Sequence, residues 1–440
     1  MKKILINTLM AVGLMATVSC EEYLDEKPEK SILVPSTKED VRYLLDNYNT
    51  LNQNPLLPFI MADDWVTNTS NWQGINPWMQ NAYLWQEDIF NPDERSTDYN
   101  ILHRKIFYAN VCLDILNDFD LDQESGGLKG EALFIRANAL FYLAQLFLPH
   151  PEGPEAEQTK IPVHFSPDVN SAAEWITVEN LLDRVKSDLV EASDLVEAKS
   201  AFRNRPDKAV VEAHLSRILL YRGDFQGAYD AAMEALNSHY GLIDYAAYAA
   251  SKPYPFDLFN KESMYYGYSS NYLVTDGPAS FVNPQLYSNY SDNDFRKGLF
   301  FKPATTGGMF LFRGSYTGDF NLFTGITYSE VLLNAAESAV RLGRNQEGLV
   351  LLEKLAKMRY KDLNLWKKNL EANTLEAVMK ERRREMVFRV TRWGDIKRLA
   401  TSGELKLPID RSINGELYSL SDESQLTLKL PEYEVSLENN

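Results

Sequence analysis

The sequence predicts a mainly α-helical protein in which helical pairs form a scaffold and long, loop-rich insertions interrupt it. Apolar residues recur at helical spacing through most of the 440-residue chain. Two segments that lie about 120 residues apart share the pattern of a helical hairpin. Stretches rich in Asn, Pro, Trp and Tyr separate the helical segments, and an apolar content of 45% is enough for a large core.

The first residues predict a secretory signal that ends at a lipidation site. Lys2 and Lys3 precede an apolar run at 4–18, which is too short to span a bilayer stably. Cys20 follows the small residue Ser19, as in a lipoprotein whose cysteine becomes the acylated, palmitate-bearing N-terminus. The alternative is an ordinary signal with a chance cysteine. We expect a signal peptide at 1–19, a lipidated tether at 20–35 and a single domain at 36–440.

The scaffold is expected to begin with a helix after a capping box at 36–39, Ser-Thr-Lys-Glu. The apolar positions of this helix share one face and are Val41, Leu44, Leu45, Tyr48 and Leu51. Prolines, asparagines and tryptophans break this regularity over 52–100. We therefore expect an insertion of long loops and short helices at about 52–100.

Three further helices are expected after this first insertion. Helical spacing returns between Ile106 and Leu116, and a strongly apolar stretch at 128–148 is stopped by Pro149. Another helix follows Thr177, with its apolar positions at Leu181, Leu182, Val185 and Leu189.

A pair of helices at 207–221 and 225–238 resembles half of a tetratricopeptide repeat. Gly223 permits the tight turn between them, and the small residues Ala228 and Ala232 allow the helices to approach closely. A second copy surrounds Gly343, at a separation far beyond the ~34 residues of a tandem array. The pairs must therefore be interrupted, and a second irregular insertion, rich in Tyr, Asn, Gly and Pro, is expected at about 240–325.

Charge and cysteine content exclude some classes of function. A formal net charge of −17 opposes nucleic-acid binding, which needs a basic footprint. The chain has two cysteines, so lipidation of Cys20 leaves only Cys112 and no intrachain disulfide. Cys112 lies within an apolar helical stretch, and we interpret it as a small core residue and not as a reactive thiol.

The candidate ligand-binding residues lie in the two insertions. The first holds four of the seven tryptophans, Trp65, Trp72, Trp78 and Trp85, among many amides. Flat aromatic faces stack on sugar rings or peptide side chains, and amides form hydrogen bonds without adding charge. The alternative is that these rings anchor a long loop to the helices. The residues predicted to contact a ligand are Trp65, Asn68, Trp72, Asn76, Trp78, Tyr83, Tyr268, Tyr272 and Tyr290.

The sequence gives little support for an enzymatic function. None of the phosphate-binding, nucleophile-elbow or zinc-protease motifs occurs, and the five histidines lack metal-ligand spacing, so no catalytic residue, metal or cofactor is predicted. Asp118, Asp120 and Asp122 alternate as in a calcium loop, but Gln123 and Lys129 replace its glycine and closing glutamate. Incidental calcium binding stays open. The basic run at 380–384, with later Arg and Lys residues, is expected to pair with carboxylates inside the protein.

The chain resembles the SusD/RagB family of outer-membrane nutrient-binding lipoproteins across essentially its whole mature length. Each match is short, but the matches occur in the order of the family. They are Cys20 with 23–25 and Pro28, then 106–110, 130–137, 161–163, 219–236, 292–296, 328–331, 381–385, 392–393, 395–398, 430–431 and 434–435. The chain departs from the family at Arg389-Val390-Thr391, where Glu-Gly-His is usual.

The resemblance implies a helical scaffold with tetratricopeptide-like units and a non-enzymatic role at the cell surface. The protein would bind a glycan or oligosaccharide and act as substrate receptor and lid for a SusC-like TonB-dependent β-barrel transporter. Relatives of the RagB type imply a peptide ligand instead. Two other classes stay open, a tetratricopeptide-like scaffold without a small ligand and a surface glycoside hydrolase.

Overall fold

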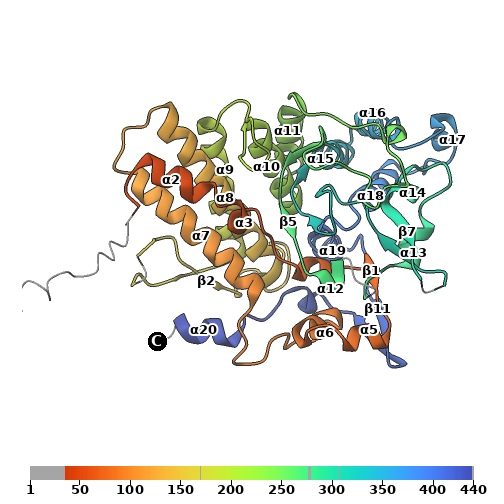
Figure 1. Ribbon diagram of the computed structural model, residues 1–440, viewed down its shortest axis with the longest axis horizontal. Coiled ribbons are helices and arrows are strands. Elements are labelled where there is room, and N and C mark those ends of the chain that lie inside the picture. The colour runs from red at the N-terminus through yellow and green to blue at the C-terminus, as the bar shows by residue number, and fades with distance from the viewer. Residues whose placement is uncertain (1–34, 169, 276–278, 306, 439–440) are drawn as a thin grey trace, which may run out of the picture.

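Helices dominate the computed structural model, which describes residues 35–438 apart from 169, 276–278 and 306 (Figure 1). The predicted mainly α class is therefore confirmed, with short strands confined to connections and insertions. The predicted signal peptide, Cys20 and nearly all of the tether lie outside the described residues. Within the described residues, no helix combines the length and apolarity needed to cross a membrane.

The long helices form a continuous series in which each packs against the next. The series begins with α7 on α8, α8 on α9 and α9 on α10, and continues through α11 to α15, which packs against α16 and α18. It extends from one end of the molecule to the other in Figure 1. The bounds are α7 (Thr97–Leu116), α8 (Gln123–Phe147), α9 (Val178–Leu195), α10 (Lys208–Arg222), α11 (Phe225–Leu236), α15 (Tyr328–Arg341), α16 (Asn345–Ala356), α18 (Thr374–Glu385) and α19 (Arg392–Thr401).

Helix α8 is the central element of the first half of the scaffold. Every residue from 132 to 147 is buried, so the helix has no polar face along these turns. This explains the strongly apolar stretch in the sequence, because a helix that is covered on all sides is apolar on nearly all of its surface. Its few polar side chains, Arg136, Asn138 and Gln145, are buried as well. Its neighbour α7 contributes Cys112, which is fully buried, and burial raises the pKa of that thiol to about 12. The structure thus confirms that Cys112 is a core residue.

The two predicted helical hairpins are present and turn at the predicted glycines. Gly223 ends α10 with φ +86°, and Gly343 follows α15 with φ +79°, both in the left-handed region that favours glycine. Asp224 then caps α11 by accepting a hydrogen bond from the Gly227 N–H at 2.9 Å. Within the second hairpin, a side chain at Gly348 would collide with Val340, so glycine allows α15 and α16 to touch.

The N-terminal helix differs in two details from the prediction. Its capping box is formed by Thr37 and Asp40, one residue later than predicted, because both side chains bond to the partner's backbone N–H at 3.0–3.1 Å. Helix α2 (Lys38–Leu45) ends at Asp46, and the chain resumes as α3 (Tyr48–Leu51). Tyr48 is consequently exposed and does not extend the apolar face.

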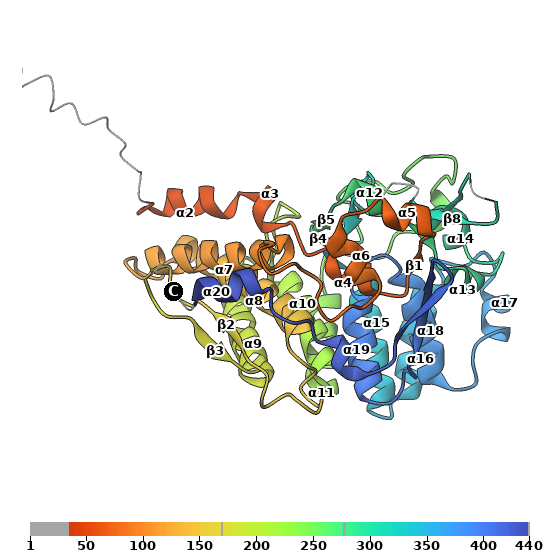
Figure 2. The ribbon, with the colours of Figure 1, turned by 90° about the horizontal axis from the view of Figure 1, so that it is seen from below.

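Both predicted insertions are irregular, as expected, and they lie together along one side of the scaffold (Figure 2). The first contains α4 (Leu57–Met61), β1 (Trp65–Val66), α5 (Thr69–Gln73) and α6 (Pro77–Tyr83). The second contains η1 (Tyr245–Ala247), β4 (Ser263–Tyr265), β5 (Tyr268–Ser269), α12 (Tyr272–Thr275), β6 (Phe281–Val282), α13 (Pro284–Ser288), α14 (Arg296–Phe300), β7 (Phe301–Pro303), β8 (Phe310–Phe312) and β9 (Leu322–Phe323).

All strand pairs in the described part of the chain are two-stranded and antiparallel. Strand β1 pairs with β6, β5 with β9, β7 with β8, and β4 with β10 (Ile326–Thr327). Outside the insertions, β2 (Ile161–Val163) pairs with β3 (Glu174–Ile176), and β11 (Ile409–Ile413) with β12 (Glu416–Leu420). The remaining elements are α17 (Leu363–Lys368), η2 (Glu423–Leu426) and α20 (Glu432–Glu438).

Candidate functional site

Two short helices of the first insertion present aromatic rings beside amides. Trp72 on α5 and Trp78 on α6 are each half-buried, and each is held in place. The Trp72 indole N–H donates to the Gln80 carbonyl at 3.2 Å, and Trp78 stacks on Phe90 with 6.0 Å between ring centres. The side chain of Asn68 caps α5 by accepting from a backbone N–H at 2.8 Å, which fixes its position at the surface.

We call the exposed parts of Asn68, Trp72, Asn76 and Trp78 the aromatic–amide face. Asn76 precedes α6 and is exposed, and its side chain makes no capping hydrogen bond to that helix. Its amide therefore keeps donors and an acceptor for another molecule. Partly accessible rings that are held in place near uncharged polar groups can stack on a ligand ring and bond to its hydroxyls. Four of the residues predicted from the sequence thus keep accessible surface in this segment.

Trp65 and Tyr83 were predicted to contact a ligand, but the structure places both in the core. Trp65 is 0% exposed and donates to the Phe59 carbonyl at 3.1 Å, while Tyr83 is 1% exposed. The two rings lie 4.8 Å apart, and the guanidinium of Arg411 lies 4.0 Å from the Tyr83 ring centre. Their faces are therefore occupied by one another and by a buried cation, which is the anchoring role that we weighed as the alternative.

The predicted tyrosines of the second insertion also include both a buried and a partly accessible residue. Tyr290 is 2% exposed and its hydroxyl donates to the Arg384 carbonyl at 2.8 Å, so it is a core residue and its prediction is corrected. Tyr268 is half-buried, stacks on Tyr266 with 5.9 Å between ring centres and donates to the Asn49 carbonyl at 3.1 Å. Tyr272 lies on α12, but its side chain is outside what the structure describes.

The two insertions are joined directly, although they lie far apart in the sequence. Trp65 of β1 is paired with Val282 of β6, and the Asn283 side-chain amide donates to the Asp63 carbonyl at 3.0 Å. Figures 1 and 2 both show α12 beside α5 and α6. The tryptophan-bearing and tyrosine-bearing segments therefore form neighbouring parts of one surface.

Ion pairs attach this surface to the scaffold. Asp63 binds Arg383 of α18 at 3.0 Å and Arg392 of α19 at 2.7 Å, and its neighbour Asp64 also binds Arg383. Burial alone would raise the pKa of Asp63, but the charges of Arg383 and Arg392 hold it well below its usual range. This part of the basic run thus pairs with internal carboxylates, which confirms the structural role expected for it.

A groove of about 710 Å³ lies between the end of the first insertion and the C-terminal part of the chain, and it was not predicted. We call it the hairpin groove, since the residues after α6 and the β11–β12 hairpin line it, including Trp85, Gln86, Leu417 and Tyr418. The tip of the hairpin reaches α5, where the Asn414 N–H donates to the Thr69 hydroxyl at 2.9 Å. The Asn-Gly pair at 414–415 could have revealed this hairpin, because it is a strong turn signal between strands.

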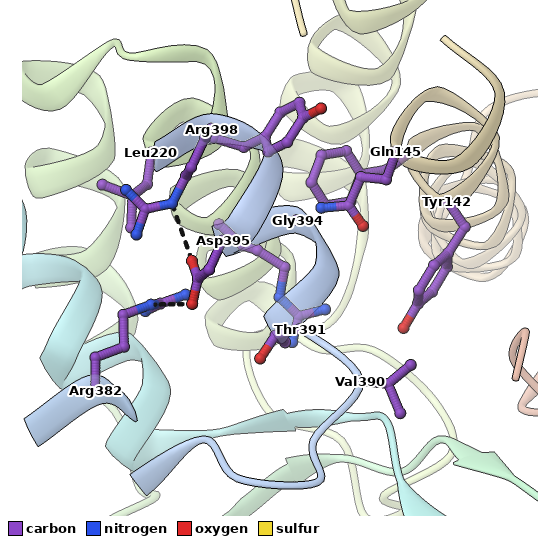
Figure 3. Close-up of a pocket in the computed structure, with 12 residues that line it drawn as sticks. Tyr142, Gln145, Leu220, Arg382, Val390, Thr391, Gly394, Asp395 and Arg398 are labelled. Atoms are coloured by element: carbon purple, nitrogen blue, oxygen red, sulfur yellow. Dashed lines mark hydrogen bonds and ion pairs between the residues drawn. The ribbon is translucent and has the colours of Figure 1, made fainter. Parts of the chain in front are cut away.

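A second cavity lies inside the scaffold and is too small for a nutrient. Figure 3 shows Tyr142 and Gln145 of α8 on one side of it and Asp395 and Arg398 of α19 on the other. The free space between them is about 20 Å³. Arg382 and Arg398 each donate to Asp395 at 2.9 Å. That volume is enough for about one water molecule. The residues here hold helices together, which is again the structural role expected for the basic run.

Within the described residues, no three His, Cys, Asp or Glu side chains are grouped in a way that could hold a metal ion. The last residue of the acidic triplet at 118–122 has a structural role. Asp122 caps α8 by accepting from the Ser125 N–H at 2.8 Å, and it pairs with Lys38 at 2.6 Å.

Comparisons with known proteins agree with this architecture. The family model described as SusD-like, "Starch-binding associating with outer membrane", matches residues 22–220, and the model described as "SusD family" matches residues 315–427. No curated protein matches the chain. Among solved structures, a SusD superfamily protein from Bacteroides thetaiotaomicron is 20% identical with a TM-score of 0.71, covering 92% of this chain and 98% of its own.

Two further solved structures have names that mention a ligand. A SusD-like carbohydrate binding protein from Bacteroides vulgatus is 17% identical with a TM-score of 0.66, covering 92% of this chain and 97% of its own. A laminarin binding SusD-like protein is 17% identical with a TM-score of 0.60, covering 83% and 91%. At these identities the structural likeness establishes the fold.

Proposed function

The chain belongs to the SusD/RagB family, and from this premise we propose that it is a nutrient-binding lipoprotein of the outer membrane. It binds a glycan or oligosaccharide at the cell surface and releases it unaltered. The family description of starch binding at the outer membrane supports this ligand class, as do the names of the carbohydrate-binding and laminarin-binding relatives.

The observation that carries the ligand proposal is the position of Trp72 and Trp78. Both indoles are fixed by contacts and remain partly accessible, and Asn68 and Asn76, which lie near them in the chain, are exposed. A pyranose ring presents C–H groups above and below its plane and hydroxyls at its edge, which match ring faces and amides respectively. Two or three such contacts give micromolar to millimolar affinity, which suits capture followed by release.

The hairpin groove extends the proposed site. Tyr418 and Gln86 line it, so it offers a ring and an amide, beside the charged side chains of Glu87 and Lys429. Because both features belong to the first insertion and the hairpin that touches it, a chain of several sugar units can contact both. Tyr268 and Tyr272 remain proposed contacts from the second insertion.

The proposed attachment depends on Cys20. Acylation of this cysteine would tether the protein to the outer membrane by its N-terminus, with about 0.8 kcal/mol gained for each buried methylene. The tether at 20–35 would hold the helical domain close to the membrane surface. The proposed partner is a SusC-like TonB-dependent barrel, for which this protein would be receptor and lid; that role rests on the family resemblance.

Calorimetric titration of the purified, detergent-solubilised protein tests the proposal. We expect heat of binding with at least one member of an oligosaccharide panel and no product in the chromatogram afterwards. Binding of short peptides instead would favour a receptor of the RagB type. Binding of neither panel, together with capture of a barrel protein, would favour a scaffold without a small ligand. Release of shorter sugars would contradict the binding-only function and favour a hydrolase.

A further inference from the structure

The β11–β12 hairpin has two strands that pair without a register shift. The loop at 414–415 has positive φ at both residues, as in a type I′ turn. Ile413 and Glu416, which flank this loop, therefore form a hydrogen-bonded pair. Along an antiparallel ladder such pairs alternate with pairs that exchange no hydrogen bond. The backbone N–H and C=O groups of Leu417 and Ser419 consequently point away from β11, toward the open edge of β12.

Three of these four backbone groups have no partner in the part of the chain that the structure describes. No hydrogen bond of the described residues involves the Leu417 N–H, the Leu417 C=O or the Ser419 N–H, and Leu417 is 68% exposed. The Ser419 C=O accepts a hydrogen bond from the Gln425 side-chain amide at 3.3 Å. Gln425 lines the hairpin groove, so the open edge of β12 faces this groove.

Strand β12 lacks most of the features that protect edge strands. Natural edge strands are often very short, bent by a bulge, or marked by a lysine or a proline. The five residues of β12 include neither lysine nor proline, and the strand has no bulge. The strands of the two insertions have only two or three residues each. An unprotected edge with an exposed leucine is a template for a further strand.

The hairpin groove provides space beside this edge. Its volume of about 710 Å³ is within the range of ligand-binding clefts, and Leu417, Tyr418 and Ser419 all line it. Successive side chains of an added strand would point to opposite faces of the sheet. They would therefore lie beside Leu417 on one face and Tyr418 on the other, and β-branched or aromatic residues suit both contacts.

The charges around the groove favour an internal segment of a longer chain over a short free peptide. Lys429, the basic residue of the described lining, pairs with Glu87 at 2.8 Å and with Asp88 at 3.0 Å. A free peptide would bring a terminal carboxylate, and sites that capture such an end supply dedicated groups for it. An internal segment carries no terminal charge.

We propose that the open edge of β12 binds an extended segment of a partner protein by β-strand addition in the hairpin groove. The backbone of the segment bonds with the Leu417 N–H and C=O and with the Ser419 N–H, and it becomes the third strand of the sheet. This interaction goes beyond glycan binding, because a polypeptide backbone supplies the contacts. A glycan in the groove and the segment would compete.

The probe is a fluorescent peptide of about seven alternating valine and threonine residues, acetylated and amidated at its ends. Fluorescence polarisation with the purified full chain should give a Kd below about 1 mM. The same peptide methylated at every backbone nitrogen keeps its side chains but has no backbone donor. It should bind at least about tenfold more weakly, because strand addition depends on main-chain hydrogen bonds. The peptide with free ends should bind no more tightly than the capped one.

Two proline variants locate the binding edge. Leu417→Pro removes the N–H that faces the groove without removing a bond to β11, and it should weaken binding of the capped peptide at least about tenfold. Ser412→Pro is the matched control, since Ser412 is opposite Leu417 and its N–H points out from the other edge of the hairpin. The control should bind like the wild type. The methylated peptide tests the proposal even if a proline variant unfolds.

Several results would overturn the proposal. Equal binding of the plain and methylated peptides would exclude strand addition, as would no binding of the plain peptide to the wild type. Tighter binding of the peptide with free ends would replace the partner segment by a free peptide. A dimer of the chain that Leu417→Pro dissociates would assign the edge to a second copy. Peptide binding that Trp72→Ala/Trp78→Ala abolishes and Leu417→Pro leaves unchanged would belong to the aromatic–amide face.

Discussion

The guanidinium carbon of Arg411 lies 4.0 Å from the ring centre of Tyr83, and the two residues come from opposite ends of the chain. Trp85 lies on the same cation at 4.2 Å, and the guanidinium donates to the Ile60 carbonyl at 3.1 Å and to the carbonyls of Ala62 and Tyr83. Among the residues that the structure describes, no carboxylate forms an ion pair with Arg411, so aromatic faces and backbone carbonyls stabilise its charge. This contact fastens the β11–β12 hairpin to the first insertion.

We therefore expect Arg411→Ala to lower the free energy of unfolding by about 3 kcal/mol, because it removes the guanidinium's hydrogen bonds to three buried carbonyls and leaves a void between the rings. Denaturant unfolding measures this loss. Arg344 is the matched control, since its guanidinium lies over Tyr229 at the surface, and Arg344→Ala should cost less than about 1 kcal/mol. Equal losses in the two variants would show that Arg411 is not an anchor.

The buried ion pair of Glu381 and Arg296 makes the free energy of unfolding fall at acid pH. The carboxylate lies 2.5 Å from the guanidinium, and both side chains are inaccessible to solvent. Burial alone would raise the pKa of Glu381, but Arg296 and Arg384 outweigh it and lower that pKa to about 2. Because the folded pKa is below the unfolded value of about 4.3, the stabilisation is present above pH 4 and is lost as the pH falls toward 2.

Glu381→Gln should therefore reduce the loss of stability between pH 5 and pH 3, and it should destabilise the protein at pH 7. Denaturant unfolding at each pH measures both effects. Glu376 lies on the same helix with its side chain exposed, so Glu376→Gln should leave the pH profile unchanged. A profile for Glu381→Gln that matches the wild type would contradict the ion-pair account.

Val390 adopts a backbone conformation that suits glycine. Its φ is +66°, in the left-handed region where a β-branched residue is strained, and the SusD/RagB resemblance implies a glycine at this position. Val390→Gly relieves the strain while it removes a buried side chain. We expect it to cost at least about 1 kcal/mol less than Val387→Gly, which removes an equally buried side chain without such relief. Equal costs in denaturant unfolding would show that the turn is unstrained.

Lipidation can be tested with the two cysteines. Labelling of cells with a palmitate analogue should mark the wild-type chain in the membrane fraction. Cys20→Ser should abolish the label and release the protein from membranes. Cys112 is buried in the core, so Cys112→Ser should keep the label. Membrane-bound, labelled protein in the Cys20→Ser variant would exclude the proposed anchor.

The helical hairpins could be predicted because their signals are local. The α10–α11 pair follows from apolar spacing and one glycine, and the structure places its bounds within two residues of the prediction. The capping box was assigned one residue early because Ser36 and Thr37 are each followed, three residues later, by an acidic side chain, and spacing alone does not choose between them.

Local sequence signals could not show which aromatic residues lie in the core and which lie at the surface. Trp65 and Trp72 lie in equally polar stretches, yet the first is in the core and the second is at the surface. What distinguishes them is contact with Arg411 and β6, hundreds of residues away in the chain. Composition identified the segment that forms the candidate site, and only tertiary contacts show which of its rings remain accessible.

The most direct test of the binding function is an oligosaccharide titration of the Trp72→Ala/Trp78→Ala double variant by calorimetry. Trp175→Ala is the matched control, because Trp175 is 46% exposed and lies on the remote β2–β3 hairpin. We expect the double variant to lose at least about tenfold in affinity, since each aromatic contact contributes roughly 0.5–1.5 kcal/mol beyond its buried area. The control should bind like the wild type. Unchanged oligosaccharide affinity in the double variant would contradict the account.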